Sequence, residues 1–222
     1  MKKYQVYIKG ETVDLVVPNK YAVEKTQWYN WFNNEKFTRI LINHGLFPNT
    51  VDDQKLVLQK MIEANKNKTG LFLLMAEKKN HKLIGVCSLS KIDWVNRCAY
   101  MAVVVSPFRK KNTVFNSLET KALLTKHAFE KLNLNKVRTS QLLELAEWQK
   151  YTNLFGYKVE GIFRNHYLKG NKYYDICLHA CLLEDYLKSK KKLGENFWPG
   201  KKRLFEIKLK FPKGEIYERV KK

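Results

Sequence analysis

The sequence has few cysteines, and they show none of the patterns that define a metal site or a disulfide scaffold. The four cysteines form no Cys-x-x-Cys pair and no cysteine–histidine cluster with zinc-site spacing. Cys87, Cys98 and Cys177 lie in apolar runs, which predicts buried free thiols. The pattern therefore excludes a zinc-binding domain and a small disulfide-stabilised protein.

Long apolar runs are also missing. No stretch approaches the roughly 20 apolar residues that cross a bilayer, so no membrane span is predicted. The first residues, MKKYQVYIKGETVDL, carry a basic pair but lack the apolar core of a signal peptide. We therefore expect a cytoplasmic protein. Its hydrophobic share of 45% over 222 residues is typical of a packed domain rather than a disordered chain.

Acidic residues are scarce relative to basic ones. The chain has 42 Lys and Arg residues against 21 Asp and Glu residues, a net charge of +21. Such a charge favours an anionic partner, which could be a nucleic acid, a membrane surface or an anionic substrate. Lysine is spread along the whole chain and no DNA- or RNA-binding motif accompanies it. The sequence therefore does not predict a nucleic-acid-binding protein.

Residues 99–131 read as a strand, a basic turn and a helix. Residues 99–105 form an uncharged apolar run, which suits a strand buried on both faces, and Ser106-Pro107 ends it. Apolar residues recur with helical spacing over 118–131. The start of such a helix attracts anions through its backbone N–H groups and dipole. The alternative is an ordinary strand–helix unit with a solvated basic turn.

The remaining segments complete a mixed pattern of strands and helices. In chain order the expected elements are β-α-α-β-β-β-α-β-α-β-β, which predicts an α+β fold with a mostly antiparallel sheet and one parallel crossover. Thr50, followed by two aspartates, predicts a helix N-cap. The expected strands are a hairpin over 4–17 and the segments 70–76, 83–92, 99–105, 136–143, 157–163 and 173–183. The expected helices lie within 25–42, after Thr50, and at 118–131 and 146–155.

The composition changes at Leu187, and the segment 187–222 is strongly basic. Apolar residues alternate at 205, 207, 209 and 211 before Pro212-Lys213-Gly214, which predicts an amphipathic β-hairpin over 203–217. An isolated hairpin is marginal in water, so it should pair with the body of the protein or with a second copy in a homodimer. The predicted organisation is a domain over 1–186 and a basic extension over 187–222.

Four stretches occur in a recognisable order: Trp28–Asn33 (WYNWFN), Leu83–Val86 (LIGV), Ala128–Val137 (AFEKLNLNKV) and Leu154–Gly161 (LFGYKVEG). In this order and spacing the chain resembles the GNAT superfamily of acyl-CoA N-acyltransferases. Within it, the chain is similar to ribosomal-protein alanine and nucleotide-amino-sugar acetyltransferases. The resemblance implies a twisted sheet with splayed central strands and a cytoplasmic N-acetyltransferase that uses acetyl-CoA as acyl donor. It also implies a primary amine as acceptor, carried by an anionic molecule such as a nucleotide-linked amino sugar, or by a protein N-terminus.

The resemblance also implies site residues. The pyrophosphate of acetyl-CoA should lie at the turn before the central helix, and Tyr151 is the candidate acid for the leaving thiolate. Trp28 and Trp31 are candidates for acceptor binding, with a role in the hydrophobic core as the alternative. The implied acetyl-CoA contacts are Val104, Val105, Arg109, Lys110, Lys111, Asn112, Thr113, Phe115 and Ser117.

The sequence departs from the family at this turn. Phe115 and Ser117 stand where the family has glycine and glycine or alanine, and Thr152 stands where it has tyrosine. Two functions therefore stay open: an active N-acetyltransferase, and an inactive binding or scaffold protein of the same fold. The carboxylates near strand ends, Asp93, Glu119 and Glu144, are expected to be solvated, which leaves the general base unassigned.

Overall fold

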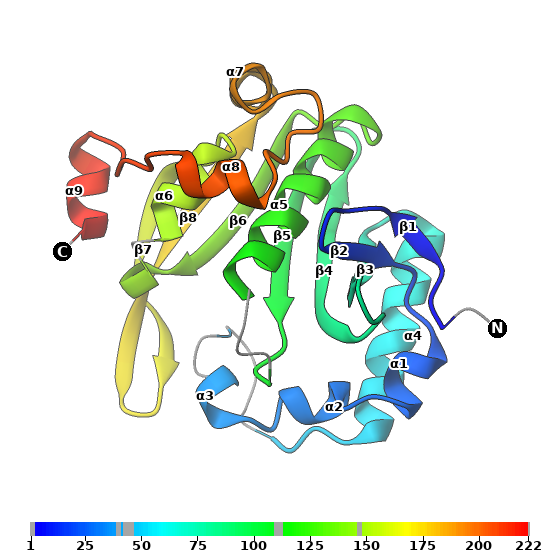
Figure 1. The fold of residues 1–222 in the computed structure, drawn as a ribbon. Helices are drawn as coiled ribbons and strands as arrows, with labels where there is room; N and C mark the ends of the chain where they lie inside the picture. Colours follow the sequence, from blue (N-terminus) through cyan, green and yellow to red (C-terminus); the bar gives the residue numbers. More distant parts are fainter. Residues whose placement is uncertain (1–2, 39–40, 42–46, 109–112, 146–147, 222) are drawn as a thin grey trace. The chain divides into compact units, whose positions relative to one another are not determined.

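The computed structural model describes residues 3–38, 41, 47–108, 113–145 and 148–221 (Figure 1). The chain divides into two compact units, Met1–Ile92 with Met101–Leu124, and Asp93–Tyr100 with Thr125–Lys222. The predicted α+β class with a mostly antiparallel sheet is confirmed. The predicted division at residue 186 stays a prediction; the unit that contains residues 187–222 resumes at Thr125.

The strands follow the order β1-β2-β3-β4-β5-β6-β8-β7. Neighbouring strands are antiparallel in the registers of β1 to β4 and of β6 to β8, whereas β5 and β6 are parallel. This is the predicted parallel crossover. The strands are β1 (Val6–Ile8), β2 (Val13–Val16), β3 (Leu71–Glu77), β4 (Leu83–Asp93), β5 (Cys98–Val105), β6 (Lys136–Leu142), β7 (Lys158–Lys169) and β8 (Lys172–Leu182).

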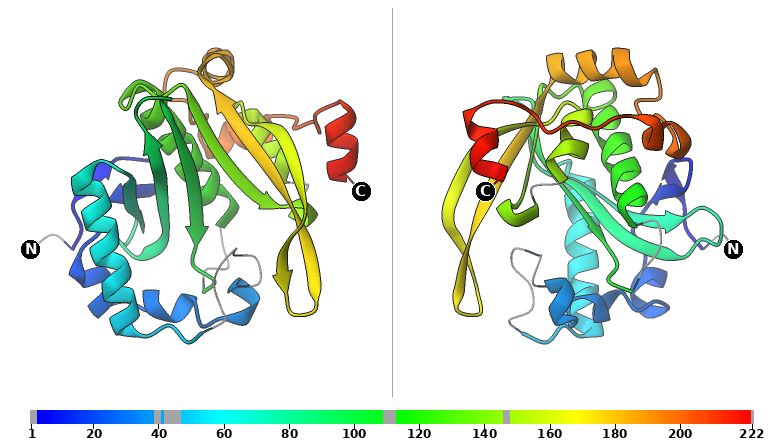
Figure 2. Two further views of the ribbon diagram at one scale, coloured as in Figure 1. Left: turned by 180° about the vertical axis from the view of Figure 1, so that it is seen from behind. Right: turned by 60° about the vertical axis from the view of Figure 1, so that its left-hand side comes forward.

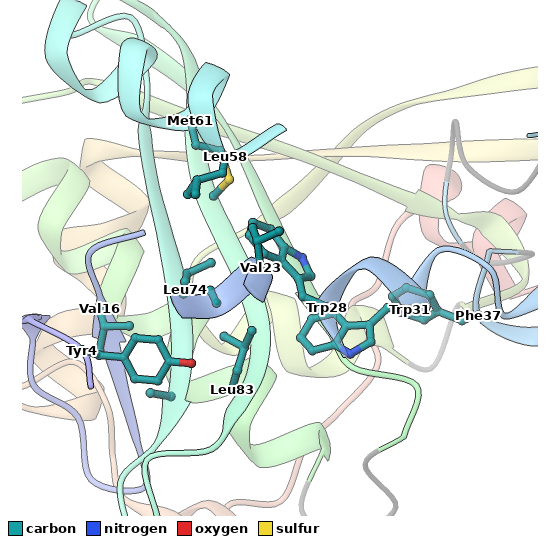
Figure 3. Close-up of a cluster of buried hydrophobic side chains, with 12 residues drawn as sticks. Tyr4, Val16, Val23, Trp28, Trp31, Phe37, Leu58, Met61, Leu74 and Leu83 are labelled. Carbon is teal, nitrogen blue, oxygen red and sulfur yellow. The ribbon is translucent and has the colours of Figure 1, made fainter. Parts of the chain in front are cut away.

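In the first unit, helices pack on the sheet through a cluster of buried apolar side chains (Figure 3). Trp28 and Trp31 from α2 lie in this cluster with Leu58 and Met61 from α4 and Leu74 from β3. Figure 2 shows α4 running alongside β3 and β4. The helices of this unit are α1 (Lys20–Glu24), α2 (Trp28–Trp31), α3 (Glu35–Thr38) and α4 (Val51–Asn67).

The N-cap of α4 is the one that the sequence predicts. The Thr50 side chain accepts a hydrogen bond from the backbone N–H of Asp53 at 3.2 Å, and the Asp53 carboxylate accepts one from the Thr50 N–H at 2.8 Å. This reciprocal capping box satisfies two donors that a helix start otherwise leaves without partners. The hydrogen bonds to Thr50 lower the pKa of Asp53.

The second unit is built on the long β7–β8 hairpin, whose register shifts between Phe163 and Tyr167. At this irregular point the Asp175 carboxylate accepts a hydrogen bond from the backbone N–H of Asn165 at 2.8 Å. The central helix α5 (Thr113–Glu130) begins in the first unit and ends in the second. The other helices here are the 3-10 helix η1 (Leu143–Leu145), α6 (Trp148–Leu154), α7 (Leu183–Leu193), α8 (Lys201–Glu206) and α9 (Glu215–Lys221).

The predicted β-hairpin over 203–217 is wrong. The described residues of this segment contain no strand: α8 and α9 occupy its two ends, joined by an irregular chain. Tyr217 and Val220 of α9 pack against Val159 of β7 and Cys177 of β8. Alternating apolar residues require a surface that covers them, but helices on the chain's own sheet meet that requirement as well as a paired strand does.

A cluster of hydrogen bonds around Glu130, the last residue of α5, holds α7 in place. Lys126, Tyr186 and Lys190 all donate to its carboxylate, and the Lys190 ammonium lies 2.9 Å from Oε1. Burial alone would raise the pKa of Glu130, but these three donors lower it to about 2. Glu130 is therefore ionised at neutral pH and joins α5 to the basic extension.

Glu130→Gln should lower the free energy of unfolding by about 1–3 kcal/mol at pH 7, because three donors lose their charged acceptor. The folded-state pKa of about 2 lies below the unfolded value. The stabilisation is therefore fully present above the unfolded pKa of about 4.3 and is lost as pH falls through the folded value. Urea denaturation between pH 7 and pH 3 should show the difference between wild type and variant shrinking toward pH 3.

Glu184→Gln is the matched control. Glu184 lies on α7, its side chain is 64% exposed, and it is 3.6 Å from Lys188, so its loss should change stability by less than about 0.5 kcal/mol at any pH. Equal effects of the two substitutions, or a Glu130 effect that does not change with pH, would contradict this account of the cluster.

Candidate active site

The turn after β5 and the start of α5 form the candidate site for the acyl donor. β5 ends at Val105, the Ser106 N–H donates to the Ile84 carbonyl at 2.8 Å, and α5 begins at Thr113. The first N–H groups of a helix have no partner within the helix, which makes them available to an anion. The helix begins five residues before the predicted start at Leu118 and so includes Val114 and Phe115, which lie four and three residues before it.

The structure places the sequence-predicted donor contacts as follows. Val104 and Val105 are half-buried at the end of β5, and Phe115 and Ser117 are half-buried in the first turns of α5. The parallel ladder joins Cys98–Tyr100 of β5 to Lys136–Arg138 of β6, and β5 continues for five residues beyond it. Arg109, Lys110, Lys111, Asn112 and the side chain of Thr113 lie outside the described residues.

Glu119, in the second turn of α5, holds the β1–β2 turn against the helix. Its carboxylate accepts hydrogen bonds from the backbone N–H groups of Glu11 and Thr12 and from the Thr12 hydroxyl. The side chain is fully buried, so the expectation that Glu119 is solvated is wrong. A Cβ on Gly10 would lie 2.5 Å from Glu119 Oε1, so glycine permits this close approach.

The same cluster includes Asn116, one turn before Glu119. Its amide nitrogen donates to the Thr12 hydroxyl at 3.2 Å. Burial raises the pKa of Glu119, and the hydrogen bonds from Thr12 and Glu11 oppose this effect. Sequence analysis missed this cluster because its members are more than a hundred residues apart in the chain. Gly10 in the first hairpin was the available signal.

Tyr151 lies in α6 and is half-buried, with its ring 5.6 Å from that of Trp148. Thr152, at the position where the family has tyrosine, is buried, and its hydroxyl donates to the Gln149 carbonyl at 3.2 Å. Of the two neighbours, Tyr151 is therefore the one whose side chain is partly exposed. A proton donor needs that exposure to reach a substrate.

Trp28 and Trp31 are 1% and 3% exposed in the core cluster of the first unit (Figure 3). This burial agrees with the role in the core that the sequence left open as an alternative. Their predicted contact with the acceptor stays a prediction.

An open groove of about 690 Å³ lies beside the irregular part of β7. Arg164, His166 and Asp175 line it together with Asn165, which has a left-handed backbone conformation. The groove is polar, and its ionisable side chains are one arginine, one histidine and one aspartate. The groove could not be predicted from the sequence, because the register shift between Phe163 and Tyr167 does not visibly interrupt the alternation of apolar and polar residues.

Comparison with known proteins decides the family. Residues 24–178 match the family described as Acetyltransferase (GNAT) domain. The chain belongs to the GNAT acetyltransferases. This confirms the predicted acyltransferase class and acetyl-CoA as the acyl donor. No curated protein matches the chain.

Solved GNAT structures share the fold at low sequence identity. Spermidine N-acetyltransferase from Vibrio cholerae, in complex with CoA and spermine, superposes with a TM-score of 0.68 at 16% identity, covering 79% of this chain and 98% of its own. RimL, a ribosomal L7/L12 alpha-N-protein acetyltransferase in complex with CoA, gives 0.68 at 12% identity, covering 81% and 98%. The microcin C7 self-immunity acetyltransferase MccE, in complex with acetyl-CoA and AMP, gives 0.63 at 19% identity, covering 78% and 93%.

The start of α5 is the part of the candidate donor site that the structure of this GNAT protein describes. The start of α5 and the strand residues beyond the β5–β6 ladder present backbone groups of the kind that a pyrophosphate and an amide-containing pantetheine arm can use. Phe115 and Ser117 add side chains where other members have little or none. The described residues are thus compatible with acetyl-CoA. No helix in the described part of the chain is long and apolar enough to cross a membrane.

Glu119→Gln should destabilise the protein by about 1–3 kcal/mol, because one acceptor oxygen facing buried donors becomes an amide donor. It should also weaken acetyl-CoA binding several-fold, since the start of α5 loses its contact with the β1–β2 turn. Thermal unfolding and calorimetric titration with acetyl-CoA measure the two effects. Glu63→Gln, an exposed change on α4, is the control. Lost stability with unchanged acetyl-CoA affinity would show that Glu119 does not position the donor site.

Proposed function

We propose that this protein transfers the acetyl group of acetyl-CoA to a primary amine carried by an anionic acceptor. The observation that carries the proposal is the net charge of +21, with twice as many basic as acidic residues. A protein with this charge raises the local concentration of anions and repels a polycation.

The chemistry requires few groups. A neutral amine attacks the thioester carbonyl, its nitrogen loses a proton to water, and the tetrahedral intermediate collapses to an amide and the CoA thiolate, which takes up a proton. We assign that proton to Tyr151. Binding of the donor pyrophosphate is assigned to the backbone at the start of α5, with Arg109, Lys110 and Lys111 neutralising its charge. Val104 and Val105 contribute main-chain contacts to the rest of the donor.

Among acceptors, a nucleotide-linked amino sugar fits the proposal first and a protein N-terminus second. The related structures include enzymes named for spermidine, for ribosomal L7/L12 and for microcin C7 self-immunity. Spermidine is a polycation, and the net charge of this chain opposes its approach. The enzymes named for ribosomal L7/L12 and for microcin C7 self-immunity are not named for a polycation, so they are compatible with an anionic acceptor here.

Tyr151→Phe should lower kcat by about 100-fold, because the leaving thiolate then takes its proton from water. The affinity for acetyl-CoA should not change, since the phenol acts only in the reaction. Tyr173→Phe, at an exposed tyrosine of β8, is the matched control and should leave kcat unchanged. Release of CoA thiol measures the rates. Full activity of Tyr151→Phe would remove Tyr151 from the reaction.

The acceptor charge can be tested with two peptides that share a free N-terminus and differ only in glutamates replaced by lysines, together with a nucleotide-linked amino sugar and spermidine. For the acidic acceptors kcat/KM should be higher and should fall about tenfold between 20 and 300 mM NaCl, because salt screens the attraction. For the lysine peptide and spermidine it should be lower and should rise with salt. Spermidine as the best acceptor would overturn the anionic assignment while leaving the acetyltransferase chemistry intact.

A further inference from the structure

Positive charge is densest in the last 36 residues of the chain. Residues 187–222 contain 13 Lys and Arg residues against 4 acidic residues, a net charge of +9, whereas the preceding 186 residues carry +12. The GNAT match ends at residue 178, so this segment lies outside the part that defines the family. A charge density about four times that of the rest of the chain indicates a separate role.

The extension is folded rather than loose. Phe197 is fully buried, with its ring 4.7 Å from that of Tyr186 and 5.7 Å from that of Phe155. Leu204 of α8 is also buried, and the Glu130 cluster holds α7. The basic side chains therefore start from a fixed backbone, and less ordering is needed when they bind a partner.

Arg203 brings the end of α7 and the start of α8 together. Its guanidinium donates to the Lys192 carbonyl at 2.9 Å and to the Leu193 carbonyl at 3.2 Å. Lys191 and Lys192 are exposed at the end of α7, and Lys202 is exposed in α8. Arg203 thus holds together the backbones of two segments that carry exposed lysines and lie about ten residues apart in sequence.

The chain between α8 and α9 carries further exposed lysines. It follows an extended path (Figure 2) in which exposed Lys208 and Lys210 alternate with half-buried Ile207, Leu209 and Phe211. Residues two apart on an extended chain lie about 6.6 Å apart and point to the same side. Lys213 is exposed further along.

These exposed lysines define the C-terminal basic surface: Lys191, Lys192, Lys202, Lys208, Lys210 and Lys213. Across the described residues, no carboxylate lies within ion-pair distance of any of the six. In contrast, Lys188 and Lys190 of the same extension pair with Glu184, Glu130 and Glu195. The charge of the basic surface is therefore not neutralised within the protein.

We propose that the C-terminal basic surface binds single-stranded nucleic acid. A phosphate backbone supplies repeated negative charge along a line, which matches lysines on two helices and an extended chain. Phe205 is 69% exposed between Lys202 and Lys208 in sequence and offers an aromatic ring to an unpaired base. A membrane surface would need a broad exposed apolar face, whereas Ile207, Leu209 and Phe211 are half-buried and Phe211 packs against the protein's own core.

The test uses the full-length protein and a fluorescein-labelled 20-nucleotide poly(U) RNA, with anisotropy measured across a range of NaCl concentrations. Replacing the six lysines of the basic surface by glutamine should weaken binding at least tenfold at 150 mM NaCl. The slope of log Kd against log salt should become shallower by about 4, because each lost phosphate contact removes about 0.7. Phe205→Ala should weaken binding about tenfold with an unchanged salt slope, since stacking releases no counterions.

The matched control replaces six exposed lysines of the first unit by glutamine: Lys9, Lys20, Lys25, Lys60, Lys66 and Lys82. It removes the same total charge and should leave most of the affinity and of the salt slope. Equal losses in the two six-lysine variants would overturn the proposal, because binding would then follow net charge alone. Binding to phosphatidylserine vesicles is measured for the same proteins. If the variant of the C-terminal basic surface lost vesicle binding but kept its RNA affinity, the proposal would be overturned and the surface would be assigned to a membrane.

Discussion

Hydrogen bonds to two carboxylates of the central helix hold together the parts of this protein on which function depends. Glu119, near the start of α5, accepts from the backbone of the β1–β2 turn, and Glu130, at its end, accepts from Tyr186 and Lys190 of α7. A carboxylate with several donors stabilises more than a surface ion pair, because few of its lone pairs stay unpaired. The first cluster lies next to the candidate donor site, and the second anchors the basic extension.

The two carboxylates respond to their surroundings in opposite ways. Burial dominates at Glu119 and raises its pKa, whereas lysine and tyrosine donors dominate at Glu130 and lower its pKa to about 2. Among the described residues, the buried Glu119 accepts hydrogen bonds from neutral donors only. Glu130 accepts hydrogen bonds from two lysines, which keep its carboxylate charged where α5 meets α7. The same residue type therefore holds the start of α5 to the β1–β2 turn in one unit and docks a basic segment in the other.

In the two proposals, the positive charge of the chain has two separate roles. The net charge over the whole chain bears on which acceptor approaches, because long-range fields act on encounter. The six lysines of the C-terminal basic surface act locally, because they lie on a folded segment and no carboxylate of the described residues is within ion-pair distance of them. An acetyltransferase domain and a nucleic-acid-binding surface can then coexist, one inside the family match and the other beyond it.

The sequence by itself determined the α+β class, most strand positions, the Thr50 cap and the family, because each depends on local periodicity, capping or a run of neighbouring residues. It did not determine the course of 203–217 or the environment of Glu119. Only the tertiary structure decided that Tyr217 and Val220 cover β7 and β8 as part of a helix, and that Gly10 admits a buried carboxylate. Alternating apolar residues show that one face of a segment must be covered, but not which element covers it. Whether a charged side chain can be buried depends on hydrogen-bond donors that lie far away in the chain.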